Sequence, residues 1–345
     1  MKSLWQILRF LLLPFGLIYW TITLFRNFLY DNNILKSYKP NVPTFVVGNL
    51  SVGGTGKTPM TEYLIRLLSS DYKTATLSRG YKRQTKGFQL ANKQSSYTDL
   101  GDEPFQFFTK FPQCYVAVDA NRVRGIQKLG SLVNDIQLFL LDDAFQHRKI
   151  KGWYNILLTS YSQLYTDDFI LPVGNLRENT SGANRANAII ITKCPQDITD
   201  RQMQVIRQKI NPTAQQYVFF TTIKYDSYVY SKKQHLLLDS LSNTPKLLLA
   251  GIANPKPFFD YLWAEGDITL SYPDHHHFTD KDITNIKHQS EGRMIITTEK
   301  DYVRLCHIFD ADNLFYLPIE ISFVKDEDIF KSQILSQIEH AHTTR

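Results

Sequence analysis

The residues with the clearest chemistry form a glycine-rich run that ends in lysine and threonine, Ser51-Val52-Gly53-Gly54-Thr55-Gly56-Lys57-Thr58. An apolar segment at 45–47 precedes the run and a helix-like segment at 60–68 follows it, which predicts a strand, a loop and a helix. Glycines let backbone N–H groups turn toward phosphate oxygens, and the helix start adds its positive end. Lys57 can then reach the β- and γ-phosphates, and the Thr58 hydroxyl can bind Mg²⁺. Ser51 replaces the first glycine of the strict pattern, but the flanking elements favour a phosphate-binding P-loop.

A pair of carboxylates follows a second apolar segment. Residues 136–141 predict a mostly buried strand, and Asp142 and Asp143 come directly after it. Buried carboxylates need a cation or hydrogen-bond donors, and an acid in this position holds Mg²⁺ against the nucleotide in P-loop enzymes. Gln146 and His147 come next, and either a supporting or a purely structural role suits them. The sequence therefore predicts a magnesium site made from Thr58, Asp142 and Asp143.

Two arginines stand where predicted strands end. Arg79 follows the strand at 74–77, and Arg122 follows the strand at 114–118. Ligands of open α/β sheets bind outside the carboxyl ends of the strands, so both side chains can meet a phosphate. A solvated arginine fits these positions equally well from the sequence alone.

Further titratable residues lie at Asp102 and at the histidine run His275-His276-His277. Asp102 precedes a helix expected at 105–110, so it can be a functional carboxylate or only a helix N-cap. Neighbouring histidines on a strand or loop point to different faces, and no matching set of cysteines or histidines accompanies them. We therefore expect no transition-metal site, although the residue types leave solvated histidines or a functional imidazole open.

The N-terminal segment combines aromatic residues with basic flanks. No charged residue occurs from 10 to 25, and residues 1–40 carry a net charge of +4, from five basic residues and one acidic residue. Sixteen uncharged residues are fewer than the ~20 that a spanning helix needs, and Pro14 and Gly16 weaken the middle of the segment. We predict a helix at 1–30 that lies in one leaflet at the membrane surface. A cleaved signal peptide and a buried core helix are the alternatives.

Composition narrows the class of protein. The chain has 345 residues, 43% of them apolar, which is enough for about two domains. Its three widely spaced cysteines suggest neither disulfides nor a zinc site and fit a reducing cytoplasm. The overall charge of +6 is concentrated beside the aromatic segment, so nucleic-acid binding is not expected.

The order of predicted elements indicates an α/β fold with two α/β units. We predict a membrane-associated helix at 1–30, a P-loop NTPase-like α/β/α domain at 31–223 and a linker strand region at 224–235. A second, smaller α/β domain is expected at 236–337, followed by a frayed tail at 338–345.

Seven motifs of the chain, taken together, resemble the tetraacyldisaccharide 4′-kinase family, which phosphorylates a lipid A precursor. In order, they are residues 48–59 (GNLSVGGTGKTP), 78–81 (SRGY), 101–104 (GDEP), 142–148 (DDAFQHR), 176–178 (LRE), 274–275 (DH) and 298–301 (TEKD). The resemblance covers 49–301 and the aromatic N-terminal segment, and the extra histidines after His275 are the main departure.

This resemblance implies a reaction and roles for residues. The enzyme would use ATP and Mg²⁺ to phosphorylate the 4′-hydroxyl of an acylated disaccharide 1-phosphate, at the cytoplasmic face of the bacterial inner membrane, as a monomer. Asp102 would be the general base, His275 its partner and Lys57 a catalytic cation. Arg79, Arg122 and Arg177 would clamp the lipid phosphate or the transition state. Domain closure would have to bring Asp102 and His275 together.

Other classes share parts of this pattern. A P-loop GTPase or metal-insertion chaperone would use the same nucleotide loop, but Pro195 replaces the aspartate that reads guanine in the element beginning at Thr192 and Lys193. ATP is therefore the expected nucleotide. A membrane scaffold that binds nucleotide without catalysis is the remaining alternative.

Overall fold

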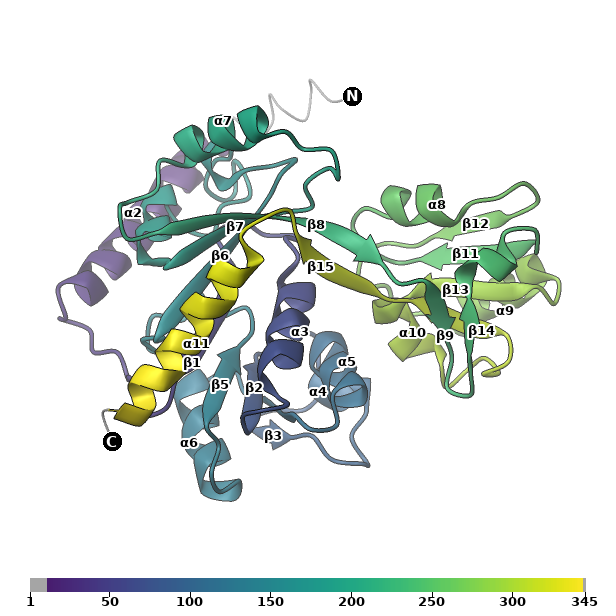
Figure 1. The fold of residues 1–345 in the computed structure, drawn as a ribbon, viewed down its shortest axis with the longest axis horizontal. Helices are drawn as coiled ribbons and strands as arrows, with labels where there is room; N and C mark the ends of the chain where they lie inside the picture. The colour runs from purple at the N-terminus through teal and green to yellow at the C-terminus, as the bar shows by residue number, and fades with distance from the viewer. Residues whose placement is uncertain (1–10, 344–345) are drawn as a thin grey trace.

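Two β-sheets of different size form the frame of the molecule in the computed structural model, which describes residues 11–343 (Figure 1). The larger sheet has nine strands, in the order β15 (Ile319–Phe323), β8 (Tyr217–Tyr225), β7 (Ala188–Thr192), β6 (Tyr154–Ser160), β1 (Thr44–Asn49), β5 (Leu138–Leu141), β2 (Thr74–Ser78), β4 (Tyr115–Val118) and β3 (Gln89–Leu90). Only the edge pairs β15–β8 and β4–β3 are antiparallel. The loops that follow the parallel strands therefore gather along one edge, where ligands bind in sheets of this kind.

Helices cover this sheet and complete what we call the large lobe. They are α3 (Lys57–Leu68), α4 (Tyr97–Leu100), α5 (Asp102–Lys110), α6 (Arg122–Leu132), α7 (Asp200–Ile210) and α11 (Glu327–Thr343), with the short 3₁₀ helices η1 (Tyr165–Asp167) and η2 (Thr180–Arg185). The central strand β1 is buried at every position. Apolar side chains of α3, among them Met60 and Leu64, share one core with β1 and α11. This packing holds the N-terminal end of α3 at the carboxyl edge of the sheet.

The second sheet builds the small lobe. Its six strands run in the order β10 (His235–Leu237), β9 (Tyr228–Tyr230), β14 (Leu314–Leu317), β13 (Met294–Thr298), β11 (Lys246–Ala250) and β12 (Ile268–Ser271). Helices α8 (Lys256–Leu262), α9 (Asp280–Ser290) and α10 (Glu299–Leu305), with the short η3 (Leu238–Leu241), accompany them. The mixed α/β character expected from the sequence is confirmed, with a large, mainly parallel sheet.

The carboxyl-terminal part of the chain differs from the sequence prediction. The segment after β14 does not stay in the small lobe, because β15 pairs antiparallel with β8 and returns the chain to the large sheet. Figure 1 shows β8 and β15 side by side between the lobes. The predicted frayed tail at 338–345 is also wrong for its described part, since α11 continues to Thr343 and buries Ile338 and Ala341. Sequence periodicity does not reveal which sheet an amphipathic helix covers.

Helix α2 (Leu13–Asp31) is the described part of the N-terminal segment, and residues 1–10 of the predicted helix lie outside the described residues. Pro14 occupies its first turn instead of weakening its middle, a position where proline is well tolerated. Among residues 11–343, no helix combines the length and the apolar character needed to cross a bilayer.

The packing of α11 can be tested on two isoleucines of the same helix. Ile338 is fully buried whereas Ile329 is 47% exposed. We expect Ile338→Ala to lower the free energy of unfolding by about 2–5 kcal/mol, because it leaves a cavity in the core. Ile329→Ala should change it by no more than about 0.5 kcal/mol. Urea denaturation followed by circular dichroism checks both, and equal small effects would contradict this placement of α11.

Candidate active site

The glycine-rich loop joins β1 to α3 at the carboxyl edge of the large sheet. Gly56 caps α3 with a positive φ of 86°, and Gly53 has a φ of 110°. Residues with side chains rarely adopt these angles, so glycine is needed at both positions. The Thr192 hydroxyl donates to the Thr55 carbonyl (2.9 Å), and Lys193 Nζ donates to the Gly54 carbonyl (2.6 Å). The end of β7 thus anchors the loop by its carbonyls, while the start of α3 offers backbone donors.

Asp142 and Asp143 lie at the end of β5, beside this loop, in opposite electrostatic surroundings. Asp143 Oδ1 is 3.7 Å from Lys57 Nζ and accepts a 2.9 Å hydrogen bond from Arg177. Burial alone would raise the pKa of Asp143, but Lys57 and Arg177 together lower it. Asp142 is buried and accepts a 3.2 Å bond from the Thr61 hydroxyl. Burial, followed by the charge of Asp143, raises the pKa of Asp142 to about 7.

These oxygen atoms suit a magnesium ion. Mg²⁺ prefers carboxylate and hydroxyl oxygens and is bound through one or two carboxylates next to substrate phosphates. Asp142 is buried and forms no ion pair with residues 11–343, so a bound cation would compensate its charge. Thr58 lies half-buried on the first turn of α3, and its hydroxyl makes no hydrogen bond with residues 11–343. Thr58, Asp142 and Asp143 therefore form a chemically suitable set.

Buried nitrogen atoms on the other side of Asp142 lack partners. Arg122 is 2% exposed and donates to the backbone carbonyls of Asp142 (3.3 Å) and Asp143 (3.4 Å), but its Nε has no partner among the described residues. His147 Nε2 is also buried without a described partner, and burial together with the charge of Arg122 lowers its pKa to about 4. Arg79 is exposed and acts electrostatically on both groups. The structure thus brings Arg79 and Arg122 together, whereas Arg177 contacts Asp143.

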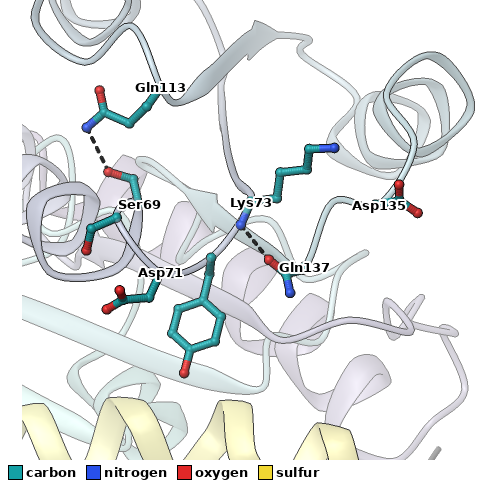
Figure 2. Close-up of a pocket in the computed structure, with 8 residues that line it drawn as sticks. Ser69, Asp71, Lys73, Gln113, Asp135 and Gln137 are labelled. Carbon is teal, nitrogen blue, oxygen red and sulfur yellow. Dashed lines mark hydrogen bonds between the residues drawn. The ribbon is translucent and has the colours of Figure 1, made fainter.

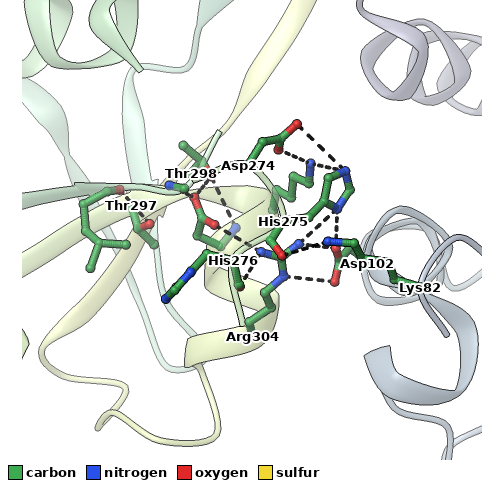
Figure 3. Close-up of polar contacts among 12 residues, drawn as sticks. Lys82, Asp102, Asp274, His275, His276, Thr297, Thr298 and Arg304 are labelled. Atoms are coloured by element: carbon green, nitrogen blue, oxygen red, sulfur yellow. Dashed lines mark hydrogen bonds and ion pairs between the residues drawn. The ribbon is translucent and has the colours of Figure 1, made fainter. Parts of the chain in front are cut away.

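Asp102 meets the small lobe (Figure 3). Its Oδ2 lies 3.2 Å from His275 Nδ1, and its Oδ1 accepts a 3.1 Å bond from Arg304 Nε. Arg304 Nη2 contacts Oδ2 as well. Burial alone would raise the pKa of Asp102. Hydrogen bonds from His275 and Arg304 lower the pKa by more than burial raises it, so the net pKa lies well below the ordinary range of an aspartate. The helix N-cap is Gly101, so Asp102 is not a mere cap.

The three histidines diverge. His275 Nε2 is 2.9 Å from Lys300 Nζ, and a lysine ammonium only donates, so this nitrogen is the acceptor and Nδ1 carries the proton toward Asp102. His276 lies 3.0 Å from Asp282. His277 lines a small cavity of about 110 Å³ together with Tyr81, Asp102, His275 and Arg304. The sequence placed the functional histidine at His275 by resemblance, and this is the one that reaches Asp102.

Arg304 and Lys300 were missed by sequence reasoning. Both lie on α10 within or just after the 298–301 motif, and Arg304 follows Asp301 by one helical turn. Asp301 accepts from the backbone of Gly251 (2.7 Å) and from the Thr298 hydroxyl (2.7 Å), and thereby fixes the start of α10. The sequence offered one signal for Arg304, namely a basic residue one helical turn after the aspartate that ends the 298–301 motif.

Two charge effects relate the Asp102–His275 pair to the surroundings of the glycine-rich loop. Glu103, which follows Asp102, raises the pKa of Asp142. Asp274, which precedes His275, acts on Lys193, the residue that holds Gly54. The carboxylate–imidazole pair and the glycine-rich loop therefore share one region between the lobes.

A larger hollow of about 460 Å³ lies at the opposite end of the sheet (Figure 2). Ser69 at the end of α3 and Lys73 before β2 line it, and Gln137 Oε1 accepts a 2.7 Å bond from the Lys73 amide. None of the residues that the sequence predicted for the site lines this hollow. Although this hollow is larger than the cavity beside Asp102, we do not assign the active site to it.

Helix α2 packs against the loop that carries Arg177, the residue that pairs with Asp143. The Tyr19 hydroxyl donates to the Arg177 carbonyl (2.9 Å), and Asn27 donates to Glu178 (2.7 Å). The outward face of α2 exposes large apolar side chains, namely Phe15, Leu17, Ile18, Ile22, Phe25 and Phe28, each between 54% and 63% exposed. The helix that exposes this apolar surface therefore contacts Arg177, which itself bonds to Asp143.

The opposite pKa shifts of the two aspartates predict opposite effects of asparagine. Because the folded state raises the pKa of Asp142, wild-type protein loses stability as pH rises toward about 7. In metal-free buffer, we expect Asp142→Asn to gain about 1–3 kcal/mol relative to wild type between pH 5 and pH 8. Asp143→Asn should instead destabilise the protein at pH 8, because Asp143 has a lowered pKa. Thermal unfolding in EDTA measures both, and matching signs would contradict the assignment.

Comparison with known proteins identifies the family of this chain. The family model for tetraacyldisaccharide-1-P 4′-kinase matches residues 8–339. The tetraacyldisaccharide 4′-kinase of Flavobacterium johnsoniae is 54% identical over 96% of this chain and 98% of its own length. That of Bacteroides thetaiotaomicron is 42% identical over 95% and 92%. The crystal structure of LpxK from Aquifex aeolicus in complex with ATP has a TM-score of 0.78 and 30% identity, covering 96% of this chain and 99% of that one. The chain belongs to the tetraacyldisaccharide-1-P 4′-kinase family.

Proposed function

We propose that this chain transfers the γ-phosphoryl group of ATP to the 4′-hydroxyl of a tetraacyldisaccharide 1-phosphate. Family membership supports the reaction class. The observation that carries the proposal is the meeting of Asp102 and His275, from different lobes, beside a phosphate-binding loop that ends in Lys57. A single chain supplies every residue of this site, so the proposal needs no second copy.

The nucleotide would bind along residues 51–58. Backbone donors at the start of α3 and the Lys57 ammonium would hold its phosphates. Thr58, Asp142 and Asp143 would hold Mg²⁺, whose chemistry here is to neutralise the charge of the bound phosphates. Lys57, now 3.7 Å from Asp143, would turn to the phosphates as they bind. Pro195, in place of a guanine-reading aspartate, supports ATP over GTP.

Asp102 would orient and deprotonate the acceptor hydroxyl. A carboxylate has about four acceptor positions, and Arg304 and His275 occupy three of those on Asp102, which leaves one for an alcohol. Its lowered pKa keeps Asp102 ionised at neutral pH. A weakened base is adequate, because the transition state of phosphoryl transfer is loose and depends mainly on positioning. His275 would fix the carboxylate through its Nδ1–H.

The arginines would provide two different functions. Arg79 and the buried Arg122, with His147 beside them, would give this region the positive charge that suits a phosphate of the lipid substrate. Arg177 would act at the nucleotide side, since it already bonds Asp143. Unpartnered nitrogen atoms of Arg122 and His147 support a polar ligand at this position.

Helix α2 would place the site at the membrane surface. Its exposed apolar face can insert among acyl chains, while its other face is fixed to the loop that carries Arg177. A substrate with acyl chains would then reach the site without leaving the bilayer. The proposed location is the cytoplasmic side of the bacterial inner membrane, where ATP is available.

The direct test is incubation of the purified chain with MgATP and the disaccharide 1-phosphate lipid. Mass spectrometry should find one added phosphate, located by fragmentation on the distal sugar. Addition of GTP in place of ATP should yield far less product. Hydrolysis of ATP without phosphorylation of the lipid would overturn the proposed function.

Loss of the general base should affect turnover more than nucleotide binding. We expect Asp102→Ala to lower kcat by roughly 10²–10⁴-fold, the usual contribution of such a group, with the KM for ATP nearly unchanged. His275→Ala should lower kcat less. Steady-state kinetics on the lipid substrate measure both, with His277→Ala as the matched control. A stronger effect of His277→Ala than of His275→Ala would remove His275 from this role.

Membrane binding should depend on the exposed face of α2. Replacing Phe15, Ile18, Ile22 and Phe25 by serine removes four apolar side chains that would enter the bilayer, and we expect binding to weaken at least roughly 100-fold. Sedimentation with vesicles that contain anionic lipid measures this. Ile329→Ser, at an isoleucine of α11 that is 47% exposed, is the control and should bind as wild type does. Undiminished binding of the fourfold variant would exclude α2 as the anchor.

A further inference from the structure

Helices α5 and α10 pack against each other across the boundary between the lobes, one from each lobe. Asp102 and Lys110 stand at the two ends of α5, and Glu299 and Arg304 lie near the two ends of α10. Arg304 pairs with Asp102, whereas Lys110 Nζ lies 2.7 Å from Glu299 Oε1. The helices therefore run antiparallel, with an ion pair between the lobes at each end. Only one of these ion pairs belongs to the site described above.

The second ion pair includes a third helix. Lys110 Nζ also lies 2.8 Å from Glu62 Oε2 on α3, and Gln106 donates to the other oxygen of Glu62 (2.8 Å). Glu62 is 1% exposed and Glu299 is 9% exposed. Arg66 lies 3.5 Å from Glu62 at the edge of this group. Lys110 thus connects the helix that begins at Lys57, the helix that begins at Asp102 and the helix that carries Arg304.

Such a cluster is an unusual way to join two surfaces. Buried charges lose their hydration, so an apolar contact of the same size is often at least as stable. Charged groups differ in one respect, because they regain hydration when the surfaces part. An ionic contact therefore fixes the register of two helices tightly when they meet, yet still allows them to separate. The two lobes need both properties if substrate is to enter between them.

Resting on the function proposed above, we propose that Lys110 is a positioning residue, which clasps α10 onto α5 and α3 and thereby sets the distance between Asp102 and the His275–Arg304 pair. It touches neither nucleotide nor acceptor. Its effect reaches the chemistry through α5, because Asp102 and Lys110 belong to the same short helix. Its loss should act on turnover, which needs the closed lobes, and not on binding of ATP to the large lobe.

The charges around Glu299 make the clasp sensitive to pH. Burial, followed by the charge of Glu62, raises the pKa of Glu299 to about 7, with Lys110 and Arg66 opposing. Glu299 in turn helps to raise the pKa of Tyr316 on β14, and Glu320 on β15 approaches Arg66 at 3.4 Å. Because closure raises the pKa of this acid, closure takes up a proton and is favoured as pH falls from about 7 toward the ordinary glutamate range. Lys110 keeps its charge, since Glu299 and Glu62 raise its pKa against burial.

The test compares Lys110→Met, Lys110→Arg and Glu299→Gln with Lys233→Met. Lys233 is the matched control, because it forms a 2.7 Å pair with Asp312 that is exposed and lies within the small lobe. We expect Lys110→Met to lower kcat roughly 10- to 100-fold, with the KM for ATP within about twofold of wild type. Lys110→Arg should restore most of kcat, and Glu299→Gln should remove the pH dependence of kcat near pH 7. Lys233→Met should behave as wild type does.

Small-angle X-ray scattering gives a second result that does not depend on activity. The radius of gyration of Lys110→Met should exceed that of wild type, and that of Lys233→Met should not. Wild-type kinetics and an unchanged radius for Lys110→Met would overturn the clasp. If Lys110→Met does not fold, Glu299→Gln decides, and a pH profile of kcat for it that matches wild type overturns the clasp equally. If the wild-type protein phosphorylates no lipid, the proposed function is refuted. The radius of gyration of Lys110→Met, compared with that of Lys233→Met, would still test the clasp.

Discussion

The arrangement of the two lobes depends on the contacts that the ionised carboxylate of Asp102 makes with Arg304 and His275. Asp102 is only 8% exposed, and burial alone would push such a group toward its neutral form. Arg304 and His275 reverse that effect, and both come from the small lobe. The charge state of this large-lobe residue is therefore set by contact with the other lobe. If the lobes parted, Asp102 would face water and lose the partners that lower its pKa.

A similar contrast of environments separates the two aspartates at the end of β5. Asp143 is neutralised by Lys57 and Arg177, whereas Asp142 has a hydroxyl and neighbouring acids. Adjacent residues with the same side chain thus have pKa values moved in opposite directions. Asp143 is compensated by two basic side chains, whereas the buried carboxylate of Asp142 accepts only a hydroxyl hydrogen bond among the described residues. Arg177 also connects Asp143 to α2, because its backbone carbonyl accepts a hydrogen bond from the Tyr19 hydroxyl. Arg177 is therefore one of the residues that link α2 to the glycine-rich loop, together with Glu178, which accepts from Asn27.

The connection between the lobes accounts for how distant segments reach one site. The chain leaves the large sheet through β8 and returns through β15, and these two strands pair with each other. Helix α11 then covers the same sheet as α3, with Phe330 and Ile334 fully buried. Helix α11 is therefore part of the core that supports the start of α3. This explains why residues 338–343, which the sequence predicted to fray, are helical in the structure.

The sequence by itself determined the local chemistry. Glycine at positions 53 and 56, with Lys57 and Thr58 after them, predicts a phosphate loop because only certain residue types permit that backbone and those contacts. The acidic pair after β5 and the α/β order of elements were predictable for the same local reason, and the motif order was sufficient to identify the family. Tertiary structure alone decided which distant charges meet. Arg304 on Asp102, Lys110 between Glu62 and Glu299, and α11 on the large sheet depend on packing between segments far apart in the chain, and the strength of a charge pair depends on burial, which no local pattern of residues encodes.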